Sequence, residues 1–132
     1  MRQLTTRAAA LVAAAIATCL SVAATPAQAA GAFHGCPSGA VCIYNGAGVD
    51  SGVESGAIYY SYGAHNLHGQ YGSHAVVNNQ TGGAWLTFCG GYNGTGEWFM
   101  SEAPNTAYPP YDFDLTPVNS IILTSGPHSG CP

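Results

Sequence analysis

Val41-Cys42-Ile43-Tyr44 and the glycine-rich stretch that follows to Gly52 have a counterpart 44 positions later, in Trp85-Leu86-Thr87-Phe88 and the glycine-rich stretch to Gly96. About thirty residues after each segment, His74-Ala75-Val76-Val77 aligns with Asn119-Ser120-Ile121-Ile122 at an offset of 45. One match of this length would carry no weight. Two matches in the same order at nearly the same offset indicate an internal duplication.

The chain beyond residue 30 has the pattern of short strands and turns. No segment carries a helical period for more than about two turns, and Gly, Asn, Ser and Pro recur every few residues. The tract Ala103–Pro117 contains four prolines, which lack the donor that a central strand needs, so we expect an ordered loop there. The strands predicted from β-branched and aromatic content are Val41–Tyr44, Ala57–Tyr62, His74–Asn78, Ala84–Cys89, Glu97–Met100 and Ser120–Thr124.

These patterns predict an all-β fold. Each repeat would supply four short strands and could not cover its own apolar face, so the two repeats are expected to pack as a small β-sandwich. We expect a single domain over 30–132, with repeat one at about 36–80 and repeat two at about 81–132.

The first thirty residues have the three zones of a secretory signal. Arg2 and Arg7 are followed by an apolar run from Ala8 to about Ala24, and small residues then end in Ala27-Gln28-Ala29. The run is shorter than the roughly 20 residues that a bilayer requires, and it leads into a cleavage site. We therefore predict a signal peptide over 1–29.

The mature chain is then expected to start near Ala30 and to be secreted to the cell exterior. One alternative stays open. Ile16-Ala17-Thr18-Cys19 resembles a lipobox, which would place a lipid on Cys19.

Charge restricts the partners of the mature chain. Both basic residues lie in the signal, so the remainder has a formal charge close to minus six. Nucleic acids and anionic membranes are bound mainly through Lys and Arg, so we expect no nucleic-acid partner and no membrane attachment after signal cleavage. The six carboxylates are Asp50, Glu54, Glu97, Glu102, Asp112 and Asp114.

Four cysteines remain after processing, and an even number in an exported chain favours two disulfides among three possible connectivities. The preferred pairing joins Cys36 to Cys42 and Cys89 to Cys131. The chain-entropy estimate assigns about 2 kcal/mol to the short loop and about 4 kcal/mol to the long one. Because a domain of about 103 residues has a modest core, we expect reduction to weaken or unfold it.

A resemblance to a known family rests on these segments. The opening Cys36-Pro37-Ser38-Gly39-Ala40-Val41-Cys42-Ile43-Tyr44-Asn45-Gly46-Ala47-Gly48 is similar to the start of the secreted actinobacterial inhibitors of peptidase inhibitor family I36, the metalloproteinase-inhibitor group. Val76-Val77-Asn78-Asn79-Gln80-Thr81-Gly82 resembles the same group. The resemblance implies two βγ-crystallin-like Greek-key motifs and a protease inhibitor whose partner is an extracellular protease, most often a metalloprotease. We expect a monomer.

Two family features are changed in this chain. Where calcium-binding crystallins carry oxygen ligands, this chain has Gln70-Tyr71 before His74-Ala75, and Leu115-Thr116 before Asn119-Ser120. We therefore predict no metal at the family positions. The family also has a second close cysteine pair, but Cys89 has no near neighbour, so the family's inhibitory loop is not carried over.

The absence of Lys and Arg excludes inhibition of trypsin-like enzymes, whose specificity pocket requires a cation. Proteases that accept apolar or aromatic residues remain, among them thermolysin-like, subtilisin-like and chymotrypsin-like enzymes. An inhibitory loop must be stiff and exposed. The two candidate contact segments are Cys89–Gly96, with Cys89, Gly90, Gly91 and Tyr92, and the loop Tyr59–Tyr71, with Tyr59, Tyr60 and Tyr62.

The alternative function is an extracellular βγ-crystallin-type structural or calcium-binding module without inhibitory activity, with Asp50, Glu54, Asp112 or Asp114 as ligands. We predict no catalytic site, because the chain has no Gly-x-Ser-x-Gly elbow and its paired acids are expected to be solvated. No cofactor is expected. The histidines His65, His68 and His74 fall within ten residues, but their spacing alone does not converge them on a metal, so no metal site is predicted.

Overall fold

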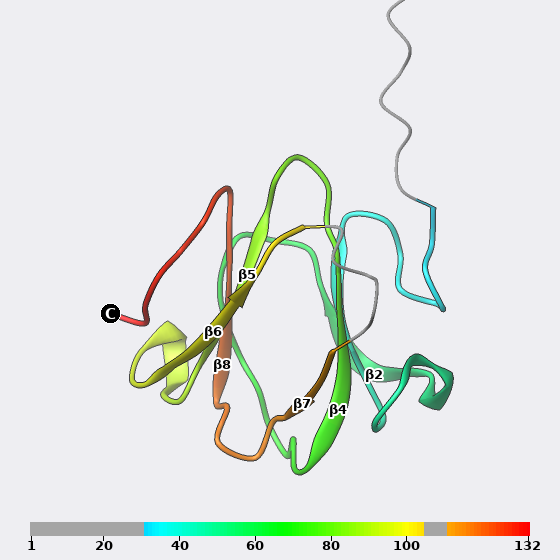
Figure 1. Cartoon of the computed structure of the whole chain (residues 1–132), viewed down its shortest axis with the longest axis horizontal. Helices are drawn as coiled ribbons and strands as arrows, with labels where there is room; N and C mark the ends of the chain where they lie inside the picture. The colour runs from blue at the N-terminus through cyan, green and yellow to red at the C-terminus, as the bar shows by residue number, and fades with distance from the viewer. Residues whose placement is uncertain (1–30, 105–110) are drawn as a thin grey trace, which may run out of the picture.

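The computed structural model describes residues 31–104 and 111–132. Within them, eight strands form two four-stranded antiparallel sheets, which Figure 1 shows face to face with β5, β6 and β8 in one sheet and β2, β4 and β7 in the other. The predicted signal peptide and Cys19 lie outside the described residues. The elements are β1 Ala40–Tyr44, η1 Val49–Ser51, β2 Val53–Tyr59, β3 Gly63–Asn66, β4 Ser73–Asn79, β5 Trp85–Cys89, η2 Tyr92–Gly94, β6 Trp98–Glu102, β7 Tyr111–Asp114 and β8 Ser120–Thr124.

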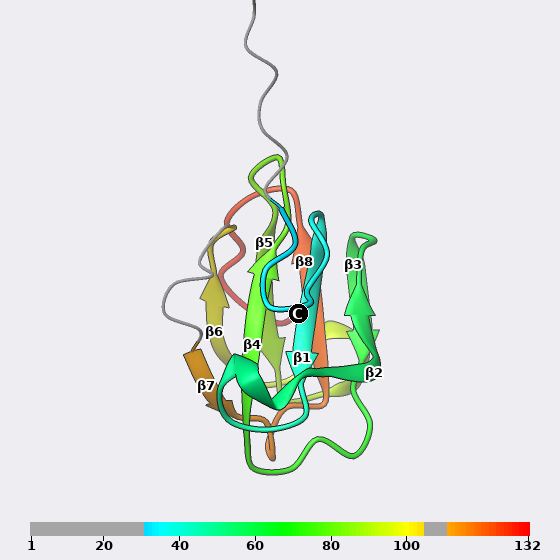
Figure 2. The same cartoon turned by 90° about the vertical axis from the view of Figure 1, so that its right-hand side faces the viewer.

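The two halves of the chain exchange one strand each. One sheet has the order β2-β1-β4-β7 and the other the order β6-β5-β8-β3. The third strand of each half therefore lies in the sheet of the other half, and Figure 2 shows β3 beside β8. Neither half can complete a four-stranded sheet by itself, so the two halves form one cooperative unit.

The strand pairing of the first half is repeated in the second half with a period of 45 residues. In the first half Ile43 lies opposite Val76, and in the second half Phe88 lies opposite Ile121, so both members of the pair advance by 45 positions. The turn after each first strand follows the same rule: the Asn45 N–H donates to the Gly52 carbonyl, and the Gly90 N–H donates to the Glu97 carbonyl. The offset of 45 between the two closing segments is therefore confirmed. The offset of 44 between the two opening segments was wrong by one position, because Ile43 corresponds to Phe88 in the structure and not to Thr87.

The main core lies between the sheets and is filled by alternate residues of the central strands. Those residues are apolar and have almost no exposed area, so their burial supplies most of the driving force for folding. Its buried members are Val41, Ile43, Ala57, Leu67, Val76, Leu86, Phe88, Leu115, Val118, Ile121 and Leu123.

A second, smaller core covers the outer face of the first sheet. Cys42, Tyr44 and Val77 point away from the sandwich interior but are fully buried, because the segment 31–39 folds back over them. The disulfide Cys36–Cys42 holds this segment in place, and the Tyr44 hydroxyl donates to the Phe33 carbonyl at 3.1 Å. Burial on both faces explains why every residue of β1 is apolar.

The C-terminal tail has the corresponding position on the second sheet. The disulfide Cys89–Cys131 ties it to the end of β5, and the Ser101 hydroxyl on β6 donates to the His128 carbonyl. The preferred cysteine pairing is therefore the one that the structure contains. Each disulfide fastens one end of the described chain to the outer face of one sheet.

Two strands were missed by the sequence patterns. The expected loop Ala103–Pro117 contains β7, which pairs with β4 through Ser73 opposite Asp114. The expectation that proline excludes a central strand agrees with the position of β7 at the edge of its sheet. The expected loop Tyr59–Tyr71 contains β3, a second edge strand that pairs with β8.

Strand β2 begins four residues earlier than expected. The prediction was Ala57–Tyr62, but β2 covers Val53–Tyr59 and is irregular, since only two positions of β1 separate the partners of Ile58 and Val53. This bulge lets an edge strand contain Ser55 and Gly56, which otherwise indicate a turn. No helix in the described part of the chain is long and apolar enough to cross a membrane.

Candidate functional site

The structure brings the two predicted contact segments together. The middle of the segment Cys89–Gly96 forms the turn η2, and the segment Tyr59–Tyr71 contains β3. Residues of η2 contact both β3 and β8. The two segments, 27 residues apart at their point of contact, therefore form one continuous surface, which we call the η2 surface. It comprises Tyr92, Asn93, Asn66 and His68.

Two asparagine side chains join the segments. The Asn66 Nδ2 donates to the Asn93 Oδ1 at 3.0 Å, and the Asn93 backbone N–H donates to the Asn66 Oδ1 at 2.6 Å. Asn93 has φ 59° and ψ 31°, a left-handed conformation that Asn tolerates better than most residues. This reciprocal pair fixes both the position and the conformation of the tip of the turn.

Further hydrogen bonds stiffen the η2 turn from below. The Gly91 N–H donates to the Thr95 carbonyl at 2.7 Å, and the Thr95 hydroxyl donates to the Tyr92 carbonyl at 2.8 Å. The Asn119 Nδ2 donates to the Gly90 carbonyl at 2.6 Å, which connects the turn to the residue before β8. A loop held in this way loses little conformational entropy when a partner binds.

The side chains of the two predicted segments differ in their exposure. Tyr92 is 51% exposed, and its ring stacks on the His68 ring with 6.1 Å between centroids. Tyr60 and Tyr62 are exposed as well. Tyr59 is partly buried against the core, and Cys89 is buried in its disulfide, so neither presents an exposed side chain on the η2 surface.

Replacing Asn66 with Ala is expected to loosen the η2 surface by about 1 kcal/mol, because two hydrogen bonds of modest net value are lost. Amide hydrogen exchange should report this as faster exchange at the Asn93 N–H. Asn45→Ala is the matched control, since the Asn45 Nδ2 braces the equivalent first-half loop through the Ser51 and Gly52 carbonyls. Unchanged exchange at Asn93 in the first variant would contradict the bracing role.

The three clustered histidines have separate positions. His65 Nε2 lies 2.8 Å from the Ser61 carbonyl, and buried His74 contacts the Tyr44 carbonyl through Nδ1 at 2.6 Å. His68 is exposed and stacks on Tyr92. Within residues 31–104 and 111–132, no three His, Cys, Asp or Glu side chains gather in a way that could hold a metal ion.

A small cleft adjoins the η2 surface. Its volume is about 240 Å³, and it lies between β2 and the residues that follow β3. Burial and the nearby Glu54 carboxylate together raise the pKa of the Tyr59 phenol. The sequence patterns do not indicate this cleft, because it exists only where residues 66–70 lie beside residues 54–59. Its polar lining is Glu54, Ser55, Tyr59, Asn66, His68 and Gln70.

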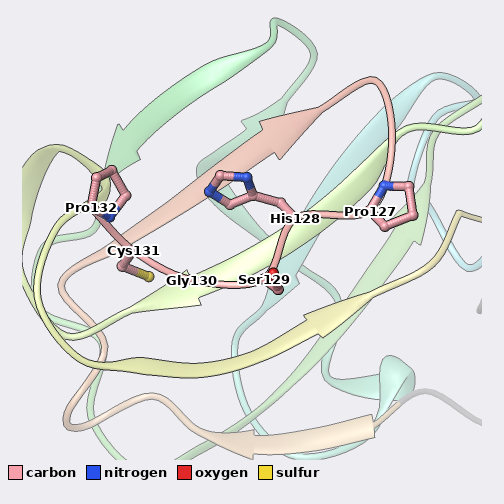
Figure 3. Close-up of a pocket in the computed structure, with 6 residues that line it drawn as sticks. All are labelled: Pro127, His128, Ser129, Gly130, Cys131 and Pro132. Carbon is pink, nitrogen blue, oxygen red and sulfur yellow. The ribbon is translucent and has the colours of Figure 1, made fainter.

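A larger hollow of about 470 Å³ is lined only by the C-terminal tail. Figure 3 shows the His128 ring on the inner side of the curve formed by Pro127–Pro132. The His128 Nε2 is buried and has no hydrogen-bond partner in the described structure. All its lining comes from six consecutive residues, so the hollow lacks the converging side chains from several elements that characterise binding sites.

Of the four paired acids, Glu97, Asp112 and Asp114 are exposed as expected, and Glu102 is not. Glu102 is only 3% exposed, at the end of β6, so this expectation was wrong for it. The Asp112 Oδ1 accepts a hydrogen bond from the Gly48 N–H at 2.8 Å and ties β7 to the loop before η1. Hydrogen bonds from Thr116 lower the pKa of Asp114. These contacts give Asp112 and Asp114 a structural role.

Comparison with protein-family models, with curated proteins and with solved structures gives no match for this chain. The class that the described residues define is therefore a small, disulfide-stabilised, two-sheet β-sandwich built from two strand-exchanged halves.

Proposed function

We propose that this protein is a secreted protease inhibitor of the peptidase inhibitor I36 type, with a βγ-crystallin-like fold. The observation that carries the proposal is the η2 surface, in which a hydrogen-bonded turn presents the exposed Tyr92 on a disulfide-tied sheet. Stiff, exposed loops bind with a small entropy cost, and Tyr is enriched among residues that dominate binding energy. Two disulfides agree with an oxidising, extracellular location.

The target class follows from the side chains that the surface offers. No Lys or Arg follows Arg7 in the sequence, so no cation is available for a trypsin-like specificity pocket. Tyr92 suits enzymes that accept aromatic or apolar residues. We propose metalloproteases of the thermolysin kind as first targets, with subtilisin-like enzymes second, and an inhibitor that acts as a monomer.

Purified protein titrated against thermolysin, subtilisin and trypsin tests the proposal. Inhibition of at least one of the first two and none of trypsin is the expected result. No inhibition of thermolysin or subtilisin at micromolar excess would remove these targets. Rapid cleavage of the protein at η2, detected by mass spectrometry, would show a substrate in place of an inhibitor.

Tyr92→Ala is expected to weaken inhibition about tenfold or more, because the loss of a large interface side chain costs at least that much at a binding hot spot. The inhibition constant against the most sensitive protease measures the effect. Tyr71→Ala is the control, since Tyr71 is 75% exposed and is not one of the residues of the η2 surface. Equal loss in both variants would argue against η2 as the contact site.

The strand exchange supports the second candidate, a βγ-crystallin-type structural or calcium-binding module of the cell exterior. In this arrangement each half completes the sheet of the other, which suits a durable extracellular building block. Melting curves with and without millimolar calcium distinguish a purely structural module from a calcium-binding module. A calcium-dependent rise in Tm would favour calcium binding, and no rise would remove it.

A further inference from the structure

The cleft beside the η2 surface contains a carboxylate that is fixed by a buried amide. Gln70 is 8% exposed, and its Nε2 donates to the Glu54 Oε2 at 2.8 Å. The Gln70 Oε1 is buried and has no hydrogen-bond partner in the described structure. One side of the cleft is therefore rich in hydrogen-bond acceptors. It carries the negative charge of Glu54, whose position is fixed by the hydrogen bond from Gln70.

The chain supplies no fixed positive charge to neutralise Glu54. No Lys or Arg occurs after Arg7, and the ion pair of the described residues, between His34 and Asp50, involves neither Glu54 nor the cleft. A carboxylate at the edge of a partly buried cleft attracts a cation more strongly than one in open solvent, because the local dielectric is lower. With a net charge near minus six, the mature domain as a whole also attracts cations.

Aromatic groups and size restrict the ligand further. The half-buried Tyr59 ring and the His68 ring line the cleft with Glu54, and a cation over an aromatic face gains additional attraction. The volume of about 240 Å³ lies below the roughly 300 Å³ at which pockets for drug-sized ligands begin, so one side chain fits better than a cofactor.

We infer that this cleft binds the guanidinium or ammonium group of an arginine or lysine side chain presented by a partner protein. A protein source fits because His68 both lines the cleft and stacks on exposed Tyr92, so a partner that covers Tyr92 also passes over the cleft. The N–H donors of the cation face the Glu54 carboxylate while its alkyl stem lies along Tyr59. The inference does not require the partner to be a protease.

The test is a chemical-shift titration of the purified protein with Nα-acetyl-arginine amide and Nα-acetyl-lysine amide. We expect saturable shifts at the Gln70 side-chain amide and the β2 backbone, with a Kd of about 1 mM for a ligand of this size. Nα-acetyl-citrulline amide, which has the shape of the arginine ligand without its charge, should produce none. Putrescine tests whether the cleft binds a free small amine instead of the side chain of a partner protein.

Two variants locate the binding. Glu54→Gln keeps an acceptor for Gln70 but removes the charge, and it should weaken binding about tenfold. Glu97→Gln removes an exposed carboxylate elsewhere and should leave the Kd unchanged. Equal binding of citrulline, unchanged binding in Glu54→Gln at an unchanged Tm, or shifts outside the cleft would overturn the inference. Binding of putrescine without the amino-acid amides would overturn the protein source. None of these results depends on inhibition assays.

Discussion

Replacement of Cys89 and Cys131 together by Ser is expected to lower the free energy of unfolding by about 4 kcal/mol. The bond closes a loop of 42 positions, and restriction of the unfolded chain grows with loop length. The loss is a large share of the roughly 5 to 15 kcal/mol that stabilises a typical domain. Urea unfolding followed by tryptophan fluorescence measures it.

The other disulfide provides the control. It closes only 6 positions, so Cys36→Ser with Cys42→Ser should cost about 2 kcal/mol on the same model. A larger loss from the short loop than from the long one would contradict the chain-entropy account. It would indicate that the N-terminal cover over Tyr44 and Val77 contributes more to stability than the restriction of the unfolded chain.

The central strands could be predicted from the sequence because their signal is local. β1, β4, β5 and β8 each have two neighbours in their sheets and are buried almost throughout, which selects apolar runs such as Ala75–Val77 in β4 and Ile121–Leu123 in β8. The duplication was visible for the same reason. It repeats the paired central strands, whose register is constrained most strongly.

The exchanged strands carry no comparable signal. β3 has the sequence Gly-Ala-His-Asn, is mostly exposed, and pairs on one side only, with β8. β7 lies in a proline-rich tract and pairs only with β4. Both are strands because a sheet of the other half offers them an edge, and that condition depends on tertiary structure.

The candidate site shows the same division. The Cys89–Cys131 disulfide could be predicted, because the cysteine count favours two bonds, while the contact role of the two segments stays a prediction. The contacts that unite the site could not: Asn66 meets Asn93 across 27 positions, and Gln70 meets Glu54 across 16. The exchange of β3 into the second sheet places the segment after it beside η2. A surface made in this way follows from the topology of two halves together and not from either repeat.

Gly94→Ala is expected to lower the free energy of unfolding by about 3 kcal/mol, because it combines backbone strain with overpacking. Gly94 has φ +74°, and a Cβ there would lie 2.8 Å from the Ile122 Cγ1 and 3.2 Å from the Ala64 Cβ. Those two atoms belong to β8 and β3, so the added methyl group would push η2 away from both strands. Urea unfolding gives the loss, and exchange at the Asn93 N–H shows whether the turn has moved.

Gly39→Ala separates the two causes. Gly39 has φ +85° and no atom within 4 Å of the position of an added Cβ, so it tests the strain alone and should cost about 1 kcal/mol. The difference between the two variants then measures how tightly η2 is packed on β3 and β8. Equal losses would mean that η2 yields easily, and a turn that yields could not present Tyr92 as the stiff contact on which the inhibitor proposal depends.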